Sequence, residues 1–124
     1  MKEVIKIEGC HKLNGTVKIN GAKNATVALI PALVLADEPI TLQGVPDISD
    51  VDALAEILEH LGVDVNIDGD EFTVDPTNMK MKEIPGHMSS KLRASYYFLG
   101  AMLGKYNEVK MKNPGGCYLG PRPM

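Results

Sequence analysis

The chain has 124 residues, of which 44% are hydrophobic and 23% charged, and its formal net charge is −3. This length fits one domain that buries its own core, and the hydrophobic fraction excludes an intrinsically disordered chain. The negative charge disfavours a non-specific nucleic-acid binder, and an aromatic content of 5% without tryptophan disfavours a stacking platform for single strands.

The first third of the chain predicts strands around a helix. Residues 4–8 and 16–20 alternate apolar and polar side chains, as half-exposed strands do. Residues 24–36 are rich in alanine and leucine and predict a helix. Residues 40–44 predict the next strand.

The remainder predicts two further helices and a hairpin. Residues 50–61 place apolar side chains on one helical face, and residues 63–75 form two alternating arms around an Asp-Gly turn. A third helix is expected from residue 89 or 90 to about 103, followed by a strand over 107–112. This order is α/β alternation with hairpins, so a purely parallel sheet is not required.

Cap and turn residues mark the expected ends of the first two helices. Asn24 is a candidate N-cap of the first helix, and Pro31 should kink it. Ser49 or Asp50 can cap the second helix, and Gly62 is the residue expected just after its C-terminus.

The segment GAKNA at residues 21–25 is a candidate anion site. A helix N-terminus presents unpaired N–H groups and a partial positive charge to a phosphate or carboxylate, and Lys23 adds a full cation there. The alternative is that Asn24 only caps the helix and Lys23 is solvated. The spacing leaves both interpretations open.

The loop PGGCYLGPRP at residues 114–123 is a candidate reactive site. Glycines before Cys117 allow a close backbone approach, and Arg122 could favour its thiolate or hold an anion. A cysteine set between loop glycines suits a functional thiol better than an inert cysteine packed in a turn.

Arg93 lies in the segment SSKLRAS at the start of the third predicted helix. Ser89, Ser90 and Lys91 share that turn, so the group could offer hydroxyls, N–H groups and two cations to an anion. Taken alone, Arg93 is more typical of an exposed helical arginine.

The sequence predicts a cytoplasmic protein without membrane insertion. The N-terminus lacks the apolar core of a signal peptide, and the longest apolar run, residues 28–36, is too short to span a bilayer. Cys10 and Cys117 are far apart and show no metal-binding spacing, so two free thiols and no metal ion are expected.

Four segments in order carry a resemblance to a known family: GAKNA, VPDISDVDALAEILEHLGV, KLRASYYFLGAML and PGGCYLGPRP. Together they resemble the N-terminal part of the UDP-N-acetylglucosamine enolpyruvyl transferases, which are 1-carboxyvinyltransferases. The resemblance implies an inside-out α/β barrel built from βαβαββ repeats, only partly present in this chain. The related 5-enolpyruvylshikimate 3-phosphate synthases would carry an SKS segment in place of GAKN and would lack the loop cysteine.

The resemblance also implies an activity. The family transfers enolpyruvyl from phosphoenolpyruvate to the 3-hydroxyl of UDP-N-acetylglucosamine and releases phosphate, through a tetrahedral ketal and without metal or organic cofactor. This is the first committed step of bacterial peptidoglycan synthesis, on which cell shape and division depend. The implied partners are these two small molecules, with no nucleic acid and no membrane, and the oligomeric state stays open.

The matching positions of this chain take their roles from the same resemblance. Cys117 matches the loop cysteine that donates a proton to the methylene carbon and that fosfomycin modifies. The positions that match substrate-binding residues are Lys23, Asn24 and Arg122 for phosphoenolpyruvate, and Asn24, Arg93, Arg122 and Pro123 for UDP-N-acetylglucosamine.

The family is much longer than this chain. The resemblance implies that residues 1–21 pack with a second globular domain, and that residues 22–124 form the first part of the catalytic domain. The catalytic aspartate and further arginines would lie beyond residue 124. We therefore expect the chain to be truncated and inactive alone; the alternative is a non-catalytic anion- or nucleotide-sugar-binding module that keeps the motifs.

Overall fold

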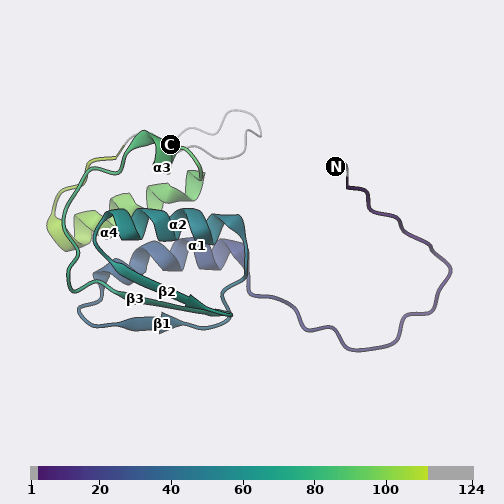
Figure 1. Cartoon of the computed structure of the whole chain (residues 1–124). Helices are drawn as coiled ribbons and strands as arrows, with labels where there is room; N and C mark the ends of the chain where they lie inside the picture. The colour runs from purple at the N-terminus through teal and green to yellow at the C-terminus, as the bar shows by residue number, and fades with distance from the viewer. Residues whose placement is uncertain (1–2, 112–124) are drawn as a thin grey trace.

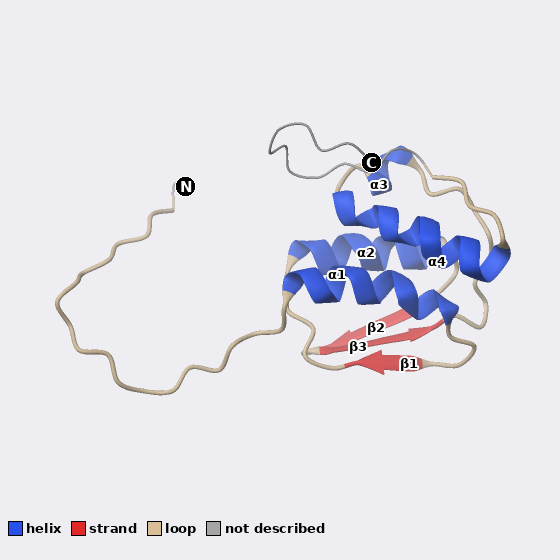
Figure 2. Ribbon diagram, turned by 180° about the vertical axis from the view of Figure 1, so that it is seen from behind, coloured by secondary structure: helices blue, strands red, loops and turns tan. Residues whose placement is uncertain are grey.

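The computed structural model describes residues 3–111, without the side chains at positions 93 and 94. A small sheet lies on one side of the molecule, two long helices cover one of its faces, and the later helices form a second layer above them (Figure 1, Figure 2). The elements are α1 (Lys23–Ala32), the 3₁₀-helix η1 (Leu33–Leu35), β1 (Ile40–Leu42), α2 (Ser49–His60), β2 (Asp64–Asp68), β3 (Glu71–Asp75), α3 (Gly86–Ser89), the 3₁₀-helix η2 (Arg93–Tyr96) and α4 (Tyr97–Tyr106).

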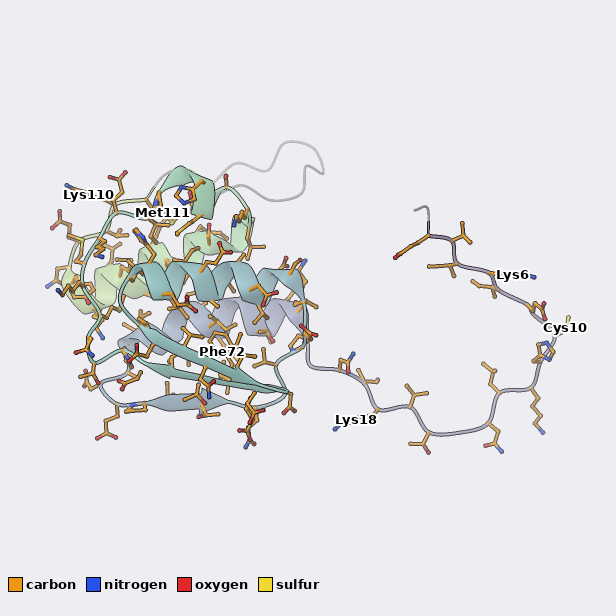
Figure 3. The ribbon with its side chains drawn as sticks, in the orientation of Figure 1. Lys6, Cys10, Lys18, Phe72, Lys110 and Met111 are labelled. Atoms are coloured by element: carbon orange, nitrogen blue, oxygen red, sulfur yellow. The ribbon has the colours of Figure 1, made fainter. Side chains whose placement is uncertain are left out.

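The sheet is antiparallel, with strand order β1-β3-β2. The predicted hairpin is confirmed, but its two-residue loop is Gly69-Asp70 and not the expected Asp-Gly pair at 68–69, because Asp68 pairs with Glu71. Phe72, which Figure 3 labels, and Val74 of β3 are fully buried, whereas Thr73 between them is only partly buried. The alternation of apolar and polar side chains along β3 therefore separates the core face from the solvent face.

Helix α2 is the best-predicted helix. Its apolar stripe is buried against the sheet and the other helices. Gly62 follows with a φ of 88°, and a Cβ there would lie 2.9 Å from the carbonyl oxygen of Asn78. A left-handed turn at Gly62 thus ends the helix as expected. The predicted cap was wrong: Ile48 occupies the N-cap position, and Ser49 and Asp50 lie inside the first turn.

Helix α1 also begins one residue earlier than predicted. Ala22 is its N-cap, so Asn24 is a helical residue and the prediction that it caps the helix was wrong. Pro31 is buried inside the helix and lacks the N–H that a regular turn would use. The α-helix ends at Ala32 and continues as the tighter turn η1.

The two strands predicted before residue 21 are not formed. Residues 4–8 and 16–20 lie on an extended segment that runs away from the body of the molecule (Figure 1). Their apolar side chains are exposed, and they make no backbone hydrogen bond to any other described residue. The alternating pattern was right for a strand, but a strand also needs a neighbouring ladder, which these residues do not have within 3–111.

The third helix, expected from residue 89 or 90 to about 103, is not continuous: α3 ends at Ser89, and the helical structure resumes as η2 and then α4. Ser89 is fully buried, and its carbonyl accepts the hydroxyl of Ser95 at 3.0 Å, where a continuous helix would use the N–H of Arg93. Asn107, with a φ of 61°, ends α4. The expected strand over 107–112 is reduced, up to residue 111, to a single parallel bridge between Ile84 and Met111.

None of the helices within residues 3–111 is long and apolar enough to cross a membrane.

Candidate functional site

Lys23 is the first residue of α1, as the sequence predicted for the start of a helix. The first turn of α1 contains no acidic residue, and its N-cap residue, Ala22, has no side chain that could accept an N–H. The carbonyl of Ala22 accepts both the backbone N–H and the hydroxyl of Thr26, at 3.2 and 2.6 Å. This helix end therefore combines a partial positive charge with the full charge of Lys23.

Asp50 faces Lys23 from the neighbouring helix. The Lys23 Nζ lies 2.7 Å from Oδ2 of Asp50, which is in the first turn of α2. Helices α1 and α2 lie side by side and begin at the same end of the molecule (Figure 1, Figure 2). Two helix N-termini, one cation and one carboxylate thus meet at a single corner of the fold.

A close backbone approach fixes the start of α1 at this corner. A Cβ on Gly21 would lie 1.8 Å from the carbonyl oxygen of Gly44, which follows β1. Gly44 itself has a φ of 76°. Only glycine at position 21 allows this approach, so the GAKNA segment begins with a residue that the packing requires.

Asn24 lies next to Lys23, in the first turn of α1, and its side chain is exposed. The structure thus keeps the two residues together at the helix start. Lys23 pairs with Asp50, although its side chain stays 59% exposed.

Two members of the group predicted around Arg93 have partners elsewhere in the fold. Ser89 is fully buried, and Lys91 donates to Glu56 of α2 at 2.7 Å. Arg93 is the first residue of η2, and its side chain is outside the described part of the structure. Since η2 packs against α1, the backbone of Arg93 belongs to an element in contact with the helix that carries Lys23.

The predicted loop residues Cys117, Arg122 and Pro123 lie outside the described residues. Cys10 has an exposed free thiol on the N-terminal segment, away from the helices (Figure 3). In residues 3–111 no three His, Cys, Asp or Glu side chains come together as metal ligands would.

Within residues 3–111, three groups have shifted pKa values, namely Asp75, Tyr97 and Tyr106. The hydroxyl and the backbone N–H of Thr77 hydrogen-bond the carboxylate of Asp75 and lower its pKa. Asp75 pairs with Asp64, beyond the C-terminal end of α2. The Tyr97 pKa is raised by a hydrogen bond with Tyr96, and burial raises that of Tyr106.

Asp50 is the one residue of this ion pair that the sequence analysis did not include in the candidate site. Its position before an apolar helical stripe suggested a helix cap. The contact with Lys23 joins residues 27 positions apart in the sequence, and no local pattern reports such a pairing. The available signal was an acidic residue in the first turn of α2, the next helix after the one that GAKNA opens.

Comparison with known proteins adds a family and several relatives. The sequence matches the family described as EPSP synthase (3-phosphoshikimate 1-carboxyvinyltransferase) over residues 7–124. A protein of Oceanobacillus iheyensis named UDP-N-acetylglucosamine 1-carboxyvinyltransferase 2 is 53% identical over 118 residues, which are 95% of this chain and 28% of that protein. The protein of the same name from Listeria monocytogenes is 50% identical over 124 residues, which are 100% of this chain and 29% of the relative.

A solved structure supports the fold. The enolpyruvyl transferase NikO from Streptomyces tendae matches with a TM-score of 0.68 and 29% identity, over 79% of this chain and 23% of that chain. The predicted fold class is thereby confirmed: the helices and the small sheet are part of an enolpyruvyl transferase fold. The chain spans less than a third of the length of each of these relatives.

Proposed function

The chain belongs to the EPSP synthase family, and from this premise we propose that it supplies the N-terminal part of an enzyme that acts on UDP-N-acetylglucosamine. That enzyme transfers the enolpyruvyl group of phosphoenolpyruvate to the 3-hydroxyl of the sugar and releases phosphate. The observation that carries this proposal is the identity of about half the residues, over nearly the whole chain, to relatives named UDP-N-acetylglucosamine 1-carboxyvinyltransferase 2.

The motifs favour this branch of the family over the shikimate branch. The sequence has GAKN at residues 21–24, where the resemblance places SKS in the shikimate enzymes, and it has Cys117 in the loop PGGC. A thiol that delivers a proton to carbon belongs to the nucleotide-sugar reaction as the resemblance describes it. We therefore assign UDP-N-acetylglucosamine, and not shikimate 3-phosphate, as the acceptor.

The proposed chemistry is an addition followed by an elimination. The catalytic aspartate that the resemblance implies takes the proton of the sugar hydroxyl as its oxygen adds to C2 of phosphoenolpyruvate, and the thiol of Cys117 gives its proton to the methylene carbon, so that a tetrahedral ketal forms. A methyl proton then returns to the thiolate while phosphate leaves with the proton held by the aspartate, which restores the double bond in the product and regenerates both groups. Lys23 and Asn24 at the start of α1, with Arg122, hold phosphoenolpyruvate, because cations and a helix N-terminus bind its phosphate and carboxylate.

Four of the positions that match the family are assigned to UDP-N-acetylglucosamine, and two of them are shared with phosphoenolpyruvate. They are Asn24, Arg93, Arg122 and Pro123, of which Asn24 and Arg122 are the shared ones. The structure supports the grouping of Asn24 with Arg93, since η2, which begins at Arg93, packs against α1. Both substrates are polyanions and the chain is acidic overall, so a few placed cations must hold them.

The wider assignment follows from this activity. We place the enzyme in the bacterial cytoplasm, in peptidoglycan synthesis, as a target of fosfomycin, with no nucleic acid or membrane partner. Residues 1–21 pack with a second globular domain and residues 22–124 form the first part of the catalytic domain. The exposed apolar side chains of the N-terminal segment support this, because such side chains are normally covered.

A chimera tests the proposed function. Residues 1–124 joined to the remainder of the Listeria monocytogenes relative should release phosphate only when both phosphoenolpyruvate and UDP-N-acetylglucosamine are present. Fosfomycin should label the chimera and its Cys10→Ala variant, but not its Cys117→Ala variant. The 124-residue chain alone should show no turnover.

Three results would contradict the proposal. Shikimate 3-phosphate as the better acceptor would move the enzyme to the other branch. Binding of UDP-N-acetylglucosamine without turnover in the chimera would support the non-catalytic binding module. Turnover by the isolated chain would show that the active site is complete within residues 1–124.

A further inference from the structure

We propose that Asp50 is a positioning residue, which holds the ammonium of Lys23 where a phosphate-bearing substrate meets it. This inference rests on the proposed function and names one more residue of the same site. Its basis is the ion pair that joins the start of α1 to the start of α2, with 2.7 Å between Nζ and Oδ2.

Asp50 is the more buried of the two side chains in this ion pair. The Asp50 side chain is 20% exposed and the Lys23 side chain 59%. Asp50 also precedes Val51, which is buried, and it belongs to a helix whose apolar stripe is packed in the core. A lysine has four rotatable side-chain bonds and loses much rotamer freedom when ordered, so its anchor must come from the more rigid partner.

The helix ends favour the same arrangement. A carboxylate is stabilised in the first turn of α2, whereas a cation at the first position of α1 meets the positive end of that helix. The negative charge of Asp50 offsets the repulsion between the Lys23 ammonium and the positive end of α1. An ammonium has three N–H donors, so an ion pair with Asp50 is compatible with a hydrogen bond to a second anion.

Asp50 could also act in the opposite direction. Its negative charge repels an incoming phosphate, so removing it would strengthen binding if repulsion outweighed positioning. The substitution Asp50→Asn separates the two effects, because it keeps the shape and removes the charge. Positioning predicts weaker binding of phosphoenolpyruvate, and repulsion predicts tighter binding.

Steady-state kinetics of the chimera give the first test. Asp50→Asn should raise the KM for phosphoenolpyruvate about tenfold or more, and should change the KM for UDP-N-acetylglucosamine less than about twofold. Asp50→Glu keeps the charge, so its KM for phosphoenolpyruvate should stay close to that of the parent. Asp52→Asn is the matched control: Asp52 shares the first turn of α2 but is exposed and has no partner among the described residues, so both KM values should stay at the parent level.

A second measurement does not depend on turnover. In the 124-residue chain labelled with ¹⁵N-lysine, the Lys23 Nζ resonance should show restricted motion in the parent and in Asp50→Glu and Asp52→Asn. It should show fast averaging in Asp50→Asn.

The outcomes separate the inference from its premise. An inactive parent chimera contradicts the proposed function, whereas a Lys23 resonance that Asp50→Asn leaves unchanged overturns the inference on Asp50. A KM for phosphoenolpyruvate that falls in Asp50→Asn also overturns it. An equal rise in the KM for phosphoenolpyruvate in Asp50→Asn and Asp52→Asn would overturn it as well, because both substitutions remove a charge from the same helix end.

Discussion

Gly21 lies two residues before α1, at a point where the packing leaves no room for a side chain. A Cβ there would lie 1.8 Å from the carbonyl oxygen of Gly44 and 3.0 Å from its carbonyl carbon, and both are backbone atoms that cannot rotate away. We expect Gly21→Ala to lower the free energy of unfolding by about 1–3 kcal/mol, the usual cost of overpacking. Urea denaturation of the 124-residue chain followed by circular dichroism measures this change.

Gly9→Ala is the matched control for Gly21→Ala. A Cβ at Gly9 meets nothing within 4 Å, so this substitution should leave the urea midpoint unchanged. Equal midpoints for the two variants would show that the approach of Gly21 to Gly44 does not constrain the start of α1.

The sequence locates the residues at the start of α1 but not their partners. GAKNA correctly predicts that Lys23 and Asn24 open a helix, because a glycine followed by a helical pattern is a local signal. The pairing of Lys23 with Asp50 depends on how two helices lie against each other, and the burial of Ser89 depends on the same packing. Such contacts between distant residues are set by the tertiary fold, which local patterns do not report.

At the level of elements, a lysine of α4 holds the end of the first helical segment. Nζ of Lys105 donates to the carbonyl of Val34 at 2.7 Å and lies 3.5 Å from that of Ala36. These carbonyls lie at the end of η1, where helical partners run out. We expect Lys105→Met to lower the free energy of unfolding by about 1–3 kcal/mol, because the substitution leaves part-buried carbonyls without a donor.

Lys82→Met controls for the loss of a positive charge. Lys82 is exposed and has no partner among the described side chains, so its substitution should change the free energy of unfolding by less than about 0.5 kcal/mol. Chemical denaturation of both variants gives the comparison. If Lys105→Met were as stable as Lys82→Met, the link from α4 to η1 would contribute nothing measurable.

Elements were predictable where a periodic pattern was joined to a turn signal. Helix α2 with Gly62 and the hairpin around Gly69 have both signals and were predicted almost to the residue. The segment from residue 89 or 90 to about 103 also has helical periodicity, but α3 ends at its start and the rest is divided between η2 and α4. The hydroxyl of Ser95 takes the carbonyl of Ser89, and a side chain that competes for a backbone acceptor is not visible in a hydrophobic pattern.

At the scale of the whole molecule, the described part consists of a packed body and an extended N-terminal segment (Figure 1). The segment has the apolar alternation of two strands, with Ile5 91% and Ile19 88% exposed. The sequence therefore predicts strands correctly only if a neighbouring sheet is present to pair with them. Their partner is not among residues 3–111, which agrees with the proposal that this segment packs with a second globular domain.

Removal of the N-terminal segment tests this division. Deleting residues 3–20 should change the free energy of unfolding of the 124-residue chain by less than about 0.5 kcal/mol, because these residues bury no apolar side chain and make no backbone hydrogen bond to the described body. The fully buried Ile84 serves as the reference, since Ile84→Ala should cost about 2–5 kcal/mol in the same assay.

In the chimera, deletion of residues 3–20 should instead lower the thermal midpoint of unfolding clearly, since the apolar side chains of the segment are then covered by the second domain. A chimera that tolerates the deletion without loss would contradict the proposed docking of residues 1–21, and a large loss in the isolated chain would show that the segment packs on the body itself.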